Sequence, residues 1–164
     1  MRLVLDTNVV ASALLWDGNP RRLMQVGRGQ EVRLFTSAPL LAELTEILLR
    51  PKFEKKIAAS QLSVDQLVDL YAELAALVRP TPTPRIAPDP DDDIVIGTAL
   101  SAEPHFLVTG DGPLLSVESY EGGLIGGGVL DGVLNIPVAE KILNESRIEN
   151  FNGGVVLQCH GCRV

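Results

Sequence analysis

The sequence predicts a three-layer α/β/α fold in which helices cover both faces of a central parallel sheet. Short apolar runs alternate along the chain with longer segments whose apolar residues recur at helical spacing. The chain has 164 residues, 46% of them hydrophobic, which is enough to bury the core of one ordinary domain. Strands that alternate with helices are typical of parallel sheets with both faces covered.

The predicted elements follow one another closely. In chain order they are a strand at 2–5, a helix at 9–15, a helix from Asn19-Pro20 to Gly27 or Gly29, a strand at 32–36, a helix that Ser37 caps and Arg50-Pro51 ends, a helix from Ser63 to Leu77, a helix at 91–100 and a strand at 106–109. Asn19 is expected to be an N-cap, and Ser63 with Gln66 has the spacing of a capping box. The proline-rich segment 80–90 cannot be helical, although 85–87 could form a brief edge strand.

The whole chain, 1–164, is expected to be one domain, with 121–164 as an atypical glycine-rich extension. Residues 122–134 are interpreted as turns of a hairpin, because no lysine follows the glycines as a phosphate-binding loop requires. A helix at 137–148 and a last strand at 154–158 are further expectations. Cys159 and Cys162 leave alternatives open: half of a zinc site, a redox pair, or a tail with two thiols.

The net charge of −7 argues against broad electrostatic attraction to nucleic acid. It does not exclude a nuclease, because a bound metal ion would reverse the sign of the local charge. No apolar run approaches the roughly 20 residues of a membrane span, and Asp6 comes too early for a signal peptide. A cytoplasmic protein without a membrane partner is therefore expected.

Four acidic residues stand where predicted elements begin or end: Asp6, Glu43, Asp93 and Asp111. Asp6 and Asp111 follow strands, so both should project into the crevice at the carboxyl ends of the sheet. Two carboxylates about 4 Å apart repel by roughly 4 kcal/mol at an effective dielectric of ~20, so a cluster requires protons or cations. Oxygen ligands of this kind suit Mg²⁺ or Mn²⁺.

Asp93 shares a helix face with Ile96, Gly97 and Leu100, at i+3, i+4 and i+7, and should therefore point inward. Gly97 and the nearby Ala99 are small enough to let this helix approach the sheet closely. Asp91 and Asp92 need no place in the site, because the positive N-terminal end of the helix already favours acids there.

At these residues the chain resembles the PIN-domain family, and in particular its compact VapC-like toxins of bacterial and archaeal toxin–antitoxin systems. The matching pieces are Asp6-Thr7-Asn8 after the first strand, Glu43 in the helix after the second strand, Asp93-x-x-Ile-Gly-x-Ala at a helix start and Thr109-x-Asp111 after a later strand. The resemblance covers roughly residues 1–120, and the longer glycine-rich tail departs from the family.

The resemblance implies an endoribonuclease in which Asp6, Glu43, Asp93 and Asp111 hold one or two Mg²⁺ or Mn²⁺ ions and carry catalysis. Asn8 and Thr109, with some help from Asp92, would orient these ligands or a water molecule. It also implies a homodimer and a neutralising antitoxin partner.

Other interpretations remain open from the residues alone. Taken separately, Asp6 could instead cap the helix that follows it, and Glu43 could be an exposed helical acid. A phosphatase with Asp6 as nucleophile is a rival, although Asn8 stands where such sites generally want a second acid. A catalytically silent module that keeps the metal is a third possibility.

Two basic segments are candidates for contacts with the RNA backbone, and ordinary solvated helix surface is the alternative. They are Arg21, Arg22 and Arg28, and Arg50, Lys52, Lys55 and Lys56.

Overall fold

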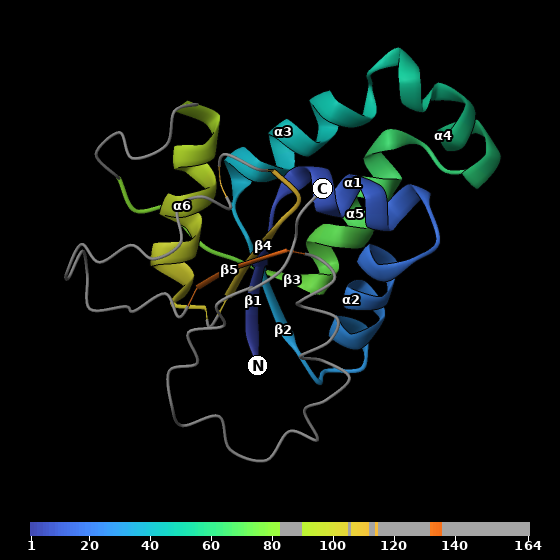
Figure 1. The fold of residues 1–164 in the computed structure, drawn as a ribbon. Coiled ribbons are helices and arrows are strands. Elements are labelled where there is room, and N and C mark those ends of the chain that lie inside the picture. The colour runs from blue at the N-terminus through green and yellow to red at the C-terminus, as the bar shows by residue number, and fades with distance from the viewer. Residues whose placement is uncertain (83–89, 105, 112–113, 115–131, 136–164) are drawn as a thin grey trace, which may run out of the picture.

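The computed structural model describes residues 1–82, 90–104, 106–111, 114 and 132–135. Its elements, in chain order, are β1 (Arg2–Leu5), α1 (Thr7–Leu15), α2 (Asn19–Arg28), β2 (Arg33–Thr36), α3 (Ala38–Leu48), the 3₁₀ helix η1 (Pro51–Phe53), α4 (Glu54–Ser60), α5 (Val64–Leu74), β3 (Ala75–Leu77), α6 (Pro90–Ala102), β4 (Phe106–Thr109) and β5 (Gly132–Asn135). Figure 1 shows these elements arranged around a central sheet.

The sheet has the strand order β3-β2-β1-β4-β5, and every neighbouring pair is parallel. The predicted three-layer α/β/α fold is thus confirmed. From β1 the chain adds β2 and β3 on one side and then returns to add β4 and β5 on the other. The direction of winding therefore reverses between β1 and β4, the position where ligands bind in open sheets of this kind.

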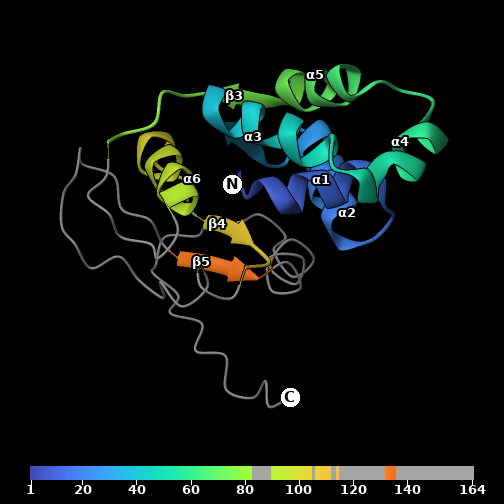
Figure 2. The same cartoon turned by 90° about the horizontal axis from the view of Figure 1, so that it is seen from above.

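Alternate residues of the strands pack against different helices, as the two-residue period of a strand requires. Leu3 and Leu5 of β1 belong to one core cluster, together with buried residues of α1, α2 and α5. Val4 of β1 belongs to a second cluster, together with buried residues of α6. Figure 2 shows α6 on one side of the sheet and α1, α2 and α5 on the other.

Helix α3 contributes to both clusters and is joined to α6 through two buried hydroxyl groups. Ser37 precedes α3 as expected, but its side chain makes no capping hydrogen bond. Its Oγ instead lies 2.8 Å from Oγ1 of Thr98. Thr98 already donates its hydroxyl hydrogen to the carbonyl of Ile94, at 2.8 Å, so Ser37 is the donor between them. This contact fixes the beginning of α3 against α6.

Two predicted helix ends were wrong. The helix that begins after Ser63 has the predicted capping box, but it ends at Leu74 rather than Leu77. Residues 75–77 form β3 because β2 offers them backbone partners, and Leu77 is 64% exposed although it continues the apolar stripe. Asn19 is the first residue of α2, and Gly18, at a φ of 129°, occupies the cap position instead.

Three further elements differ from the sequence-based expectations. The short helices η1 and α4 were not predicted, because their few apolar residues show no clear period. The hairpin interpretation is wrong at residues 132–135, which form β5 parallel to β4. The rest of that segment, the possible strand at 85–87, the elements expected at 137–148 and 154–158, and both cysteines lie outside the described residues. No described helix is long and apolar enough to cross a membrane.

Gly97 lies against the chain segment that follows β3, not against the sheet as expected. A Cβ atom at this position would lie 2.5 Å from the carbonyl oxygen of Thr81. The same segment is held to α6 by a hydrogen bond from Thr81 N to Gly97 O, at 3.0 Å. Ala99 of α6, by contrast, is fully buried in the cluster beneath the sheet.

We predict that Gly97→Ala lowers the free energy of unfolding by about 1–2 kcal/mol, although alanine is the better helix former by about 1 kcal/mol. The new methyl group would displace a backbone carbonyl, which cannot rotate away as a side chain can. Gly29→Ala is the matched control, because its nearest contact is the flexible end of Glu31. Urea unfolding measures both, and equal stabilities for the two variants would contradict the close approach at Gly97.

Candidate active site

The site lies where the central strands β1 and β4 end. Asp6 follows β1 directly, and its backbone N–H donates to the carbonyl of Val108 at 2.9 Å, which extends the pairing of the two strands. Asp111 comes two residues after the end of β4. In Figure 1, β1 leads from the N-terminus to the beginning of α1, beside β4. The prediction that Asp6 and Asp111 each follow a strand is therefore confirmed. The two strands, β1 and β4, are the neighbours between which the strand order reverses.

Asp6 is a buried carboxylate, 5% exposed, held by three hydrogen-bond donors. Its Oδ1 accepts from the backbone N–H of Asn8 at 3.3 Å and from the Thr7 hydroxyl at 3.2 Å. Its Oδ2 accepts from the Thr109 hydroxyl at 2.7 Å. Asp6 is thus the N-cap of α1. This role is compatible with the predicted role in a metal site, which the sequence left as the alternative.

Thr109 connects the two aspartates at the strand ends. Its Oγ1 donates to Asp6 and accepts from the backbone N–H of Asp111 at 3.0 Å. Because the accepted bond occupies a lone pair of Oγ1, the hydroxyl hydrogen is free to point at Asp6. Thr109 itself is fully buried. It therefore sets the position of Asp6 relative to the loop that carries Asp111.

Thr7 connects Asp6 to Glu43, a contact that sequence reasoning did not assign. Glu43 is half-buried on α3, and its Oε1 accepts from the Thr7 hydroxyl at 3.0 Å. The same hydroxyl lies 3.2 Å from Oδ1 of Asp6, so one hydrogen serves two carboxylates. The position of Thr7 next to Asp6 was the only sign in the sequence of a bridging role. The residues around Thr7 do not indicate that Glu43 is its second partner.

Asp111 has one buried oxygen atom without a hydrogen-bond partner, its Oδ1. Buried polar atoms in folded proteins nearly always have partners, so an exception calls for an explanation such as a bound ion. Beside Asp111 lies a hollow of about 260 Å³, lined by Asn8, Val9, Ser12, Gly110 and Asp111. Asn8 is exposed at its edge, in agreement with a role in orienting something bound there.

Asp93 lies half-buried near the beginning of α6, and Asp92 beside it is half-buried as well. The helix packs against β1, β2 and α3. Ile96 and Leu100, which share its face with Asp93, are buried in the second core cluster, as predicted. Hydrogen bonds connect Asp6, Glu43 and Asp111 through two threonines, and Asp93 is the predicted fourth member of the site.

Within the ranges that the structure describes, no three His, Cys, Asp or Glu side chains form a ready-made metal-binding group. The donors near the hollow nevertheless suit a hard divalent cation, because they are carboxylate, amide and hydroxyl oxygens. The unpartnered Oδ1 of Asp111 gives such an ion a buried acceptor. The residues therefore fit a hard divalent metal ion on chemical grounds.

Comparison with protein families places the chain in a known family. The PIN-domain family matches residues 2–112, which include all four acids, and the chain belongs to this family. PIN domains are generally metal-dependent nucleases. A comparison with curated proteins finds no match.

We predict that Thr109→Val weakens Mn²⁺ binding by about 10- to 100-fold, the range seen when a group that orients metal ligands is removed. Valine has nearly the same shape but cannot donate to Asp6. Thr109→Ser keeps the hydroxyl and should bind Mn²⁺ nearly as tightly as the unchanged protein. Isothermal titration calorimetry measures the affinities, and equal affinities for the valine and serine variants would contradict the role of the hydroxyl.

A second prediction concerns the unpartnered oxygen of Asp111. Without metal, Asp111→Asn should leave the free energy of unfolding unchanged or raise it, because the substitution reduces the charge at a buried atom without a partner. Mn²⁺ at a hundred times its Kd should stabilise the unchanged protein by about 2.7 kcal/mol and the variant by much less. Urea unfolding in EDTA and in Mn²⁺ gives both values. Asp69→Asn, at an exposed position of α5, should behave as the unchanged protein.

Proposed function

We propose that this protein is a metal-dependent endoribonuclease that hydrolyses RNA phosphodiester bonds. The observation that carries the proposal is the linked pair of aspartates at the reversal of strand order. Asp6 and Asp111 are joined through Thr109, and one buried oxygen of Asp111 has no partner. Membership of a family of metal-dependent nucleases supports the same chemistry.

In this proposal Asp6, Glu43, Asp93 and Asp111 hold one or two Mg²⁺ or Mn²⁺ ions. When bound, the metal activates a water molecule and stabilises negative charge on the phosphate and the leaving oxygen. No histidine base is needed. Support for the assignment of Glu43 comes from its hydrogen bond to Thr7, which also contacts Asp6.

The remaining polar residues of the proposed site have positioning roles. Thr109 holds Asp6 against the Asp111 loop, and Thr7 holds Glu43 toward Asp6. Asn8 stands at the edge of the hollow, where it would orient the substrate phosphate or a water molecule. Asp92 assists from the position next to Asp93.

We further propose that the protein is the cytoplasmic toxin of a toxin–antitoxin pair and acts as a homodimer. The resemblance of its motifs to VapC-like toxins supports this role. A cognate antitoxin would neutralise the acidic site with a basic side chain. Growth arrest on expression, relieved by the product of a neighbouring gene, is the outcome expected for this role.

The decisive experiment incubates the full chain with labelled single-stranded RNA in Mn²⁺, in Mg²⁺ and in EDTA. Asp6→Asn and Asp93→Asn should each lower the cleavage rate by at least about 100-fold, because each removes a charged metal ligand. Asp69→Asn, an exposed acid on α5, is the control with the same change of charge and should keep full activity.

Each alternative function gives a different result in this experiment. RNA cleavage that survives EDTA, or both site substitutions, would sink the proposal of metal-dependent hydrolysis. Turnover of a phosphomonoester without RNA cleavage would identify a phosphatase. Mn²⁺ binding without either activity would identify a silent metal-holding module.

A further inference from the structure

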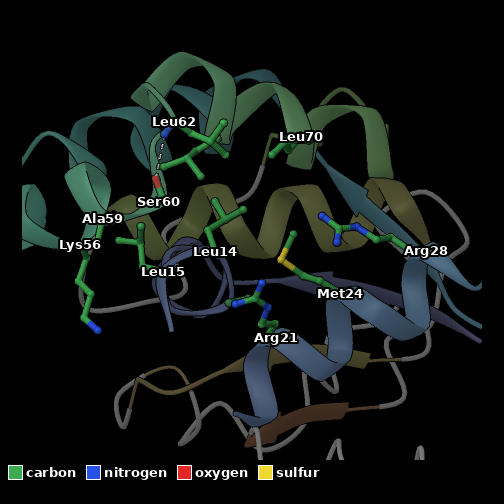
Figure 3. A pocket seen from close by; sticks show the side chains of 12 residues that line it. Leu14, Leu15, Arg21, Met24, Arg28, Lys56, Ala59, Ser60, Leu62 and Leu70 are labelled. Carbon is green, nitrogen blue, oxygen red and sulfur yellow. Dashed lines mark hydrogen bonds between the residues drawn. The ribbon is translucent and has the colours of Figure 1, made fainter. Parts of the chain in front are cut away.

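A second pocket lies at the opposite end of α1 from the acidic site. It has a volume of about 350 Å³ and is lined by residues of α1, α2, α4 and α5. Figure 3 shows Leu14, Leu15, Met24, Leu62 and Leu70 among the side chains that surround it. These residues give the pocket a largely apolar floor, and Leu70 is 38% exposed.

Cations from both basic segments of the sequence come together around this floor. Arg21 and Arg28 lie seven residues apart on α2, so they share one helix face with Met24, and Lys56 comes from α4. Figure 3 shows Met24 between the two arginines, and Lys56 at the opposite end of the pocket from Arg28. No Asp or Glu of the described chain lines the pocket. A chain with a net charge of −7 therefore has a locally positive pocket here.

An aromatic side chain stands beside the same pocket. Trp16 follows Leu15 at the end of α1 and is 36% exposed. Nζ of Lys56 lies 5.7 Å from the centre of the Trp16 ring. Phe53 supports that ring edge-on, with the ring centres 5.6 Å apart, and carries Lys52 over its own face. A positive groove with an exposed aromatic ring is the usual surface for single-stranded nucleic acid, because any base can stack on the ring.

Helix α1 connects this pocket to the acidic site. Asn8, Val9 and Ser12 face the hollow beside Asp111, whereas Ala13, Leu14 and Leu15 line the pocket. From Asn8 to Leu15 the helix rises about 10 Å. At the ~3.4 Å spacing of phosphates along a stacked strand, this corresponds to about three nucleotides.

We propose that the pocket binds the substrate RNA a few nucleotides away from the bond that is cut, and this inference rests on the proposed ribonuclease function. Arg28 and Lys56 contact backbone phosphates, and a base stacks on Trp16 or enters the apolar floor. Arg21 contributes less, because it is already paired with Asp17 at 2.8 Å. These contacts position the strand without reading its sequence.

An acidic amphipathic peptide is the other occupant that three cations and an apolar floor would accept. The exposed tryptophan with a lysine against its ring favours RNA, because this combination suits a base next to a phosphate. The continuity of α1 between the pocket and the acidic site favours RNA as well. A peptide partner gives no reason for that alignment.

The test measures binding of a fluorescently labelled single-stranded RNA of about 12 nucleotides to the full chain in EDTA, at several salt concentrations. The slope of log affinity against log salt should fall in magnitude by about 1.4 in the double variant Arg28→Gln and Lys56→Gln, at about 0.7 per lost phosphate contact. Arg33→Gln with Arg79→Gln is the matched control. These two arginines are exposed, but they belong to neither basic segment and do not line the pocket.

Trp16 gives an independent readout, because it is the only tryptophan in the chain. Unlabelled RNA should quench its fluorescence in the unchanged protein and in the control variant. Trp16→Leu should weaken binding of labelled RNA about tenfold, and Trp16→Phe less, because phenylalanine keeps a face for stacking.

Equal salt slopes for the pocket variant and the control variant would overturn the inference. If the pocket variant loses affinity for a synthetic acidic amphipathic peptide but binds RNA as tightly as the unchanged protein, the inference is overturned in favour of a protein partner. Cleavage of RNA in Mn²⁺ is measured in parallel. If the unchanged protein cleaves RNA but the pocket and control variants have equal salt slopes, the pocket inference fails and the proposed function stands. If the unchanged protein does not cleave RNA, the proposed function fails, and the salt slopes still decide whether the pocket binds RNA.

Discussion

β1 and β4 lie side by side at the centre of the sheet although a hundred residues separate them along the chain. Their register pairs Leu5 with Val108, so the next residue of each strand, Asp6 and Thr109, also meet. The hydrogen bond of 2.7 Å between those side chains follows from this register. A slip of one residue would turn Thr109 to the other face of the sheet and separate it from Asp6. The apolar core that fixes the register thereby positions the site.

The polar contacts at the strand ends make a buried negative charge tolerable. A carboxylate removed from water is costly unless donors replace the lost hydration, and Asp6 has two threonine hydroxyls and a backbone N–H. Asp111 is treated differently, because its buried Oδ1 has no partner. The Asp6 carboxylate has all these partners, whereas Asp111 nearby keeps a buried oxygen without one. This difference is understandable if the site is arranged to bind a ligand and not for stability alone.

Helix α1 gives the molecule two ends of opposite character. Its N-terminal end is capped by Asp6 and faces the acidic hollow, and its C-terminal end leads to a pocket ringed by Arg21, Arg28 and Lys56. A strongly acidic chain repels nucleic acid overall, so local cations at a fixed distance from the acids become important for any RNA substrate. The proposed metal and the proposed contacts of the pocket with RNA both offset the repulsion between an acidic protein and RNA phosphates, at different places on the molecule.

The sequence alone determined the features whose causes are local. Apolar runs identified the strands that flank Asp6 and Asp111, and the spacing of Ser63 and Gln66 identified a capping box that the structure contains. The sequence also identified the four candidate acids, because the motif around each one is short and contiguous. The parallel, doubly covered sheet followed from strand–helix alternation.

Only the tertiary structure decided which distant groups meet. The end of α5 at Leu74 depends on the free edge of β2, and the hydroxyl of Ser37 binds Thr98 of α6 instead of capping its own helix. The bridge from Thr7 to Glu43 joins residues of different helices. Arg28 and Lys56 also come together from separate helices. The sequence places each of these groups on its element, but the packing of one element against another sets their partners, and no local pattern records that packing.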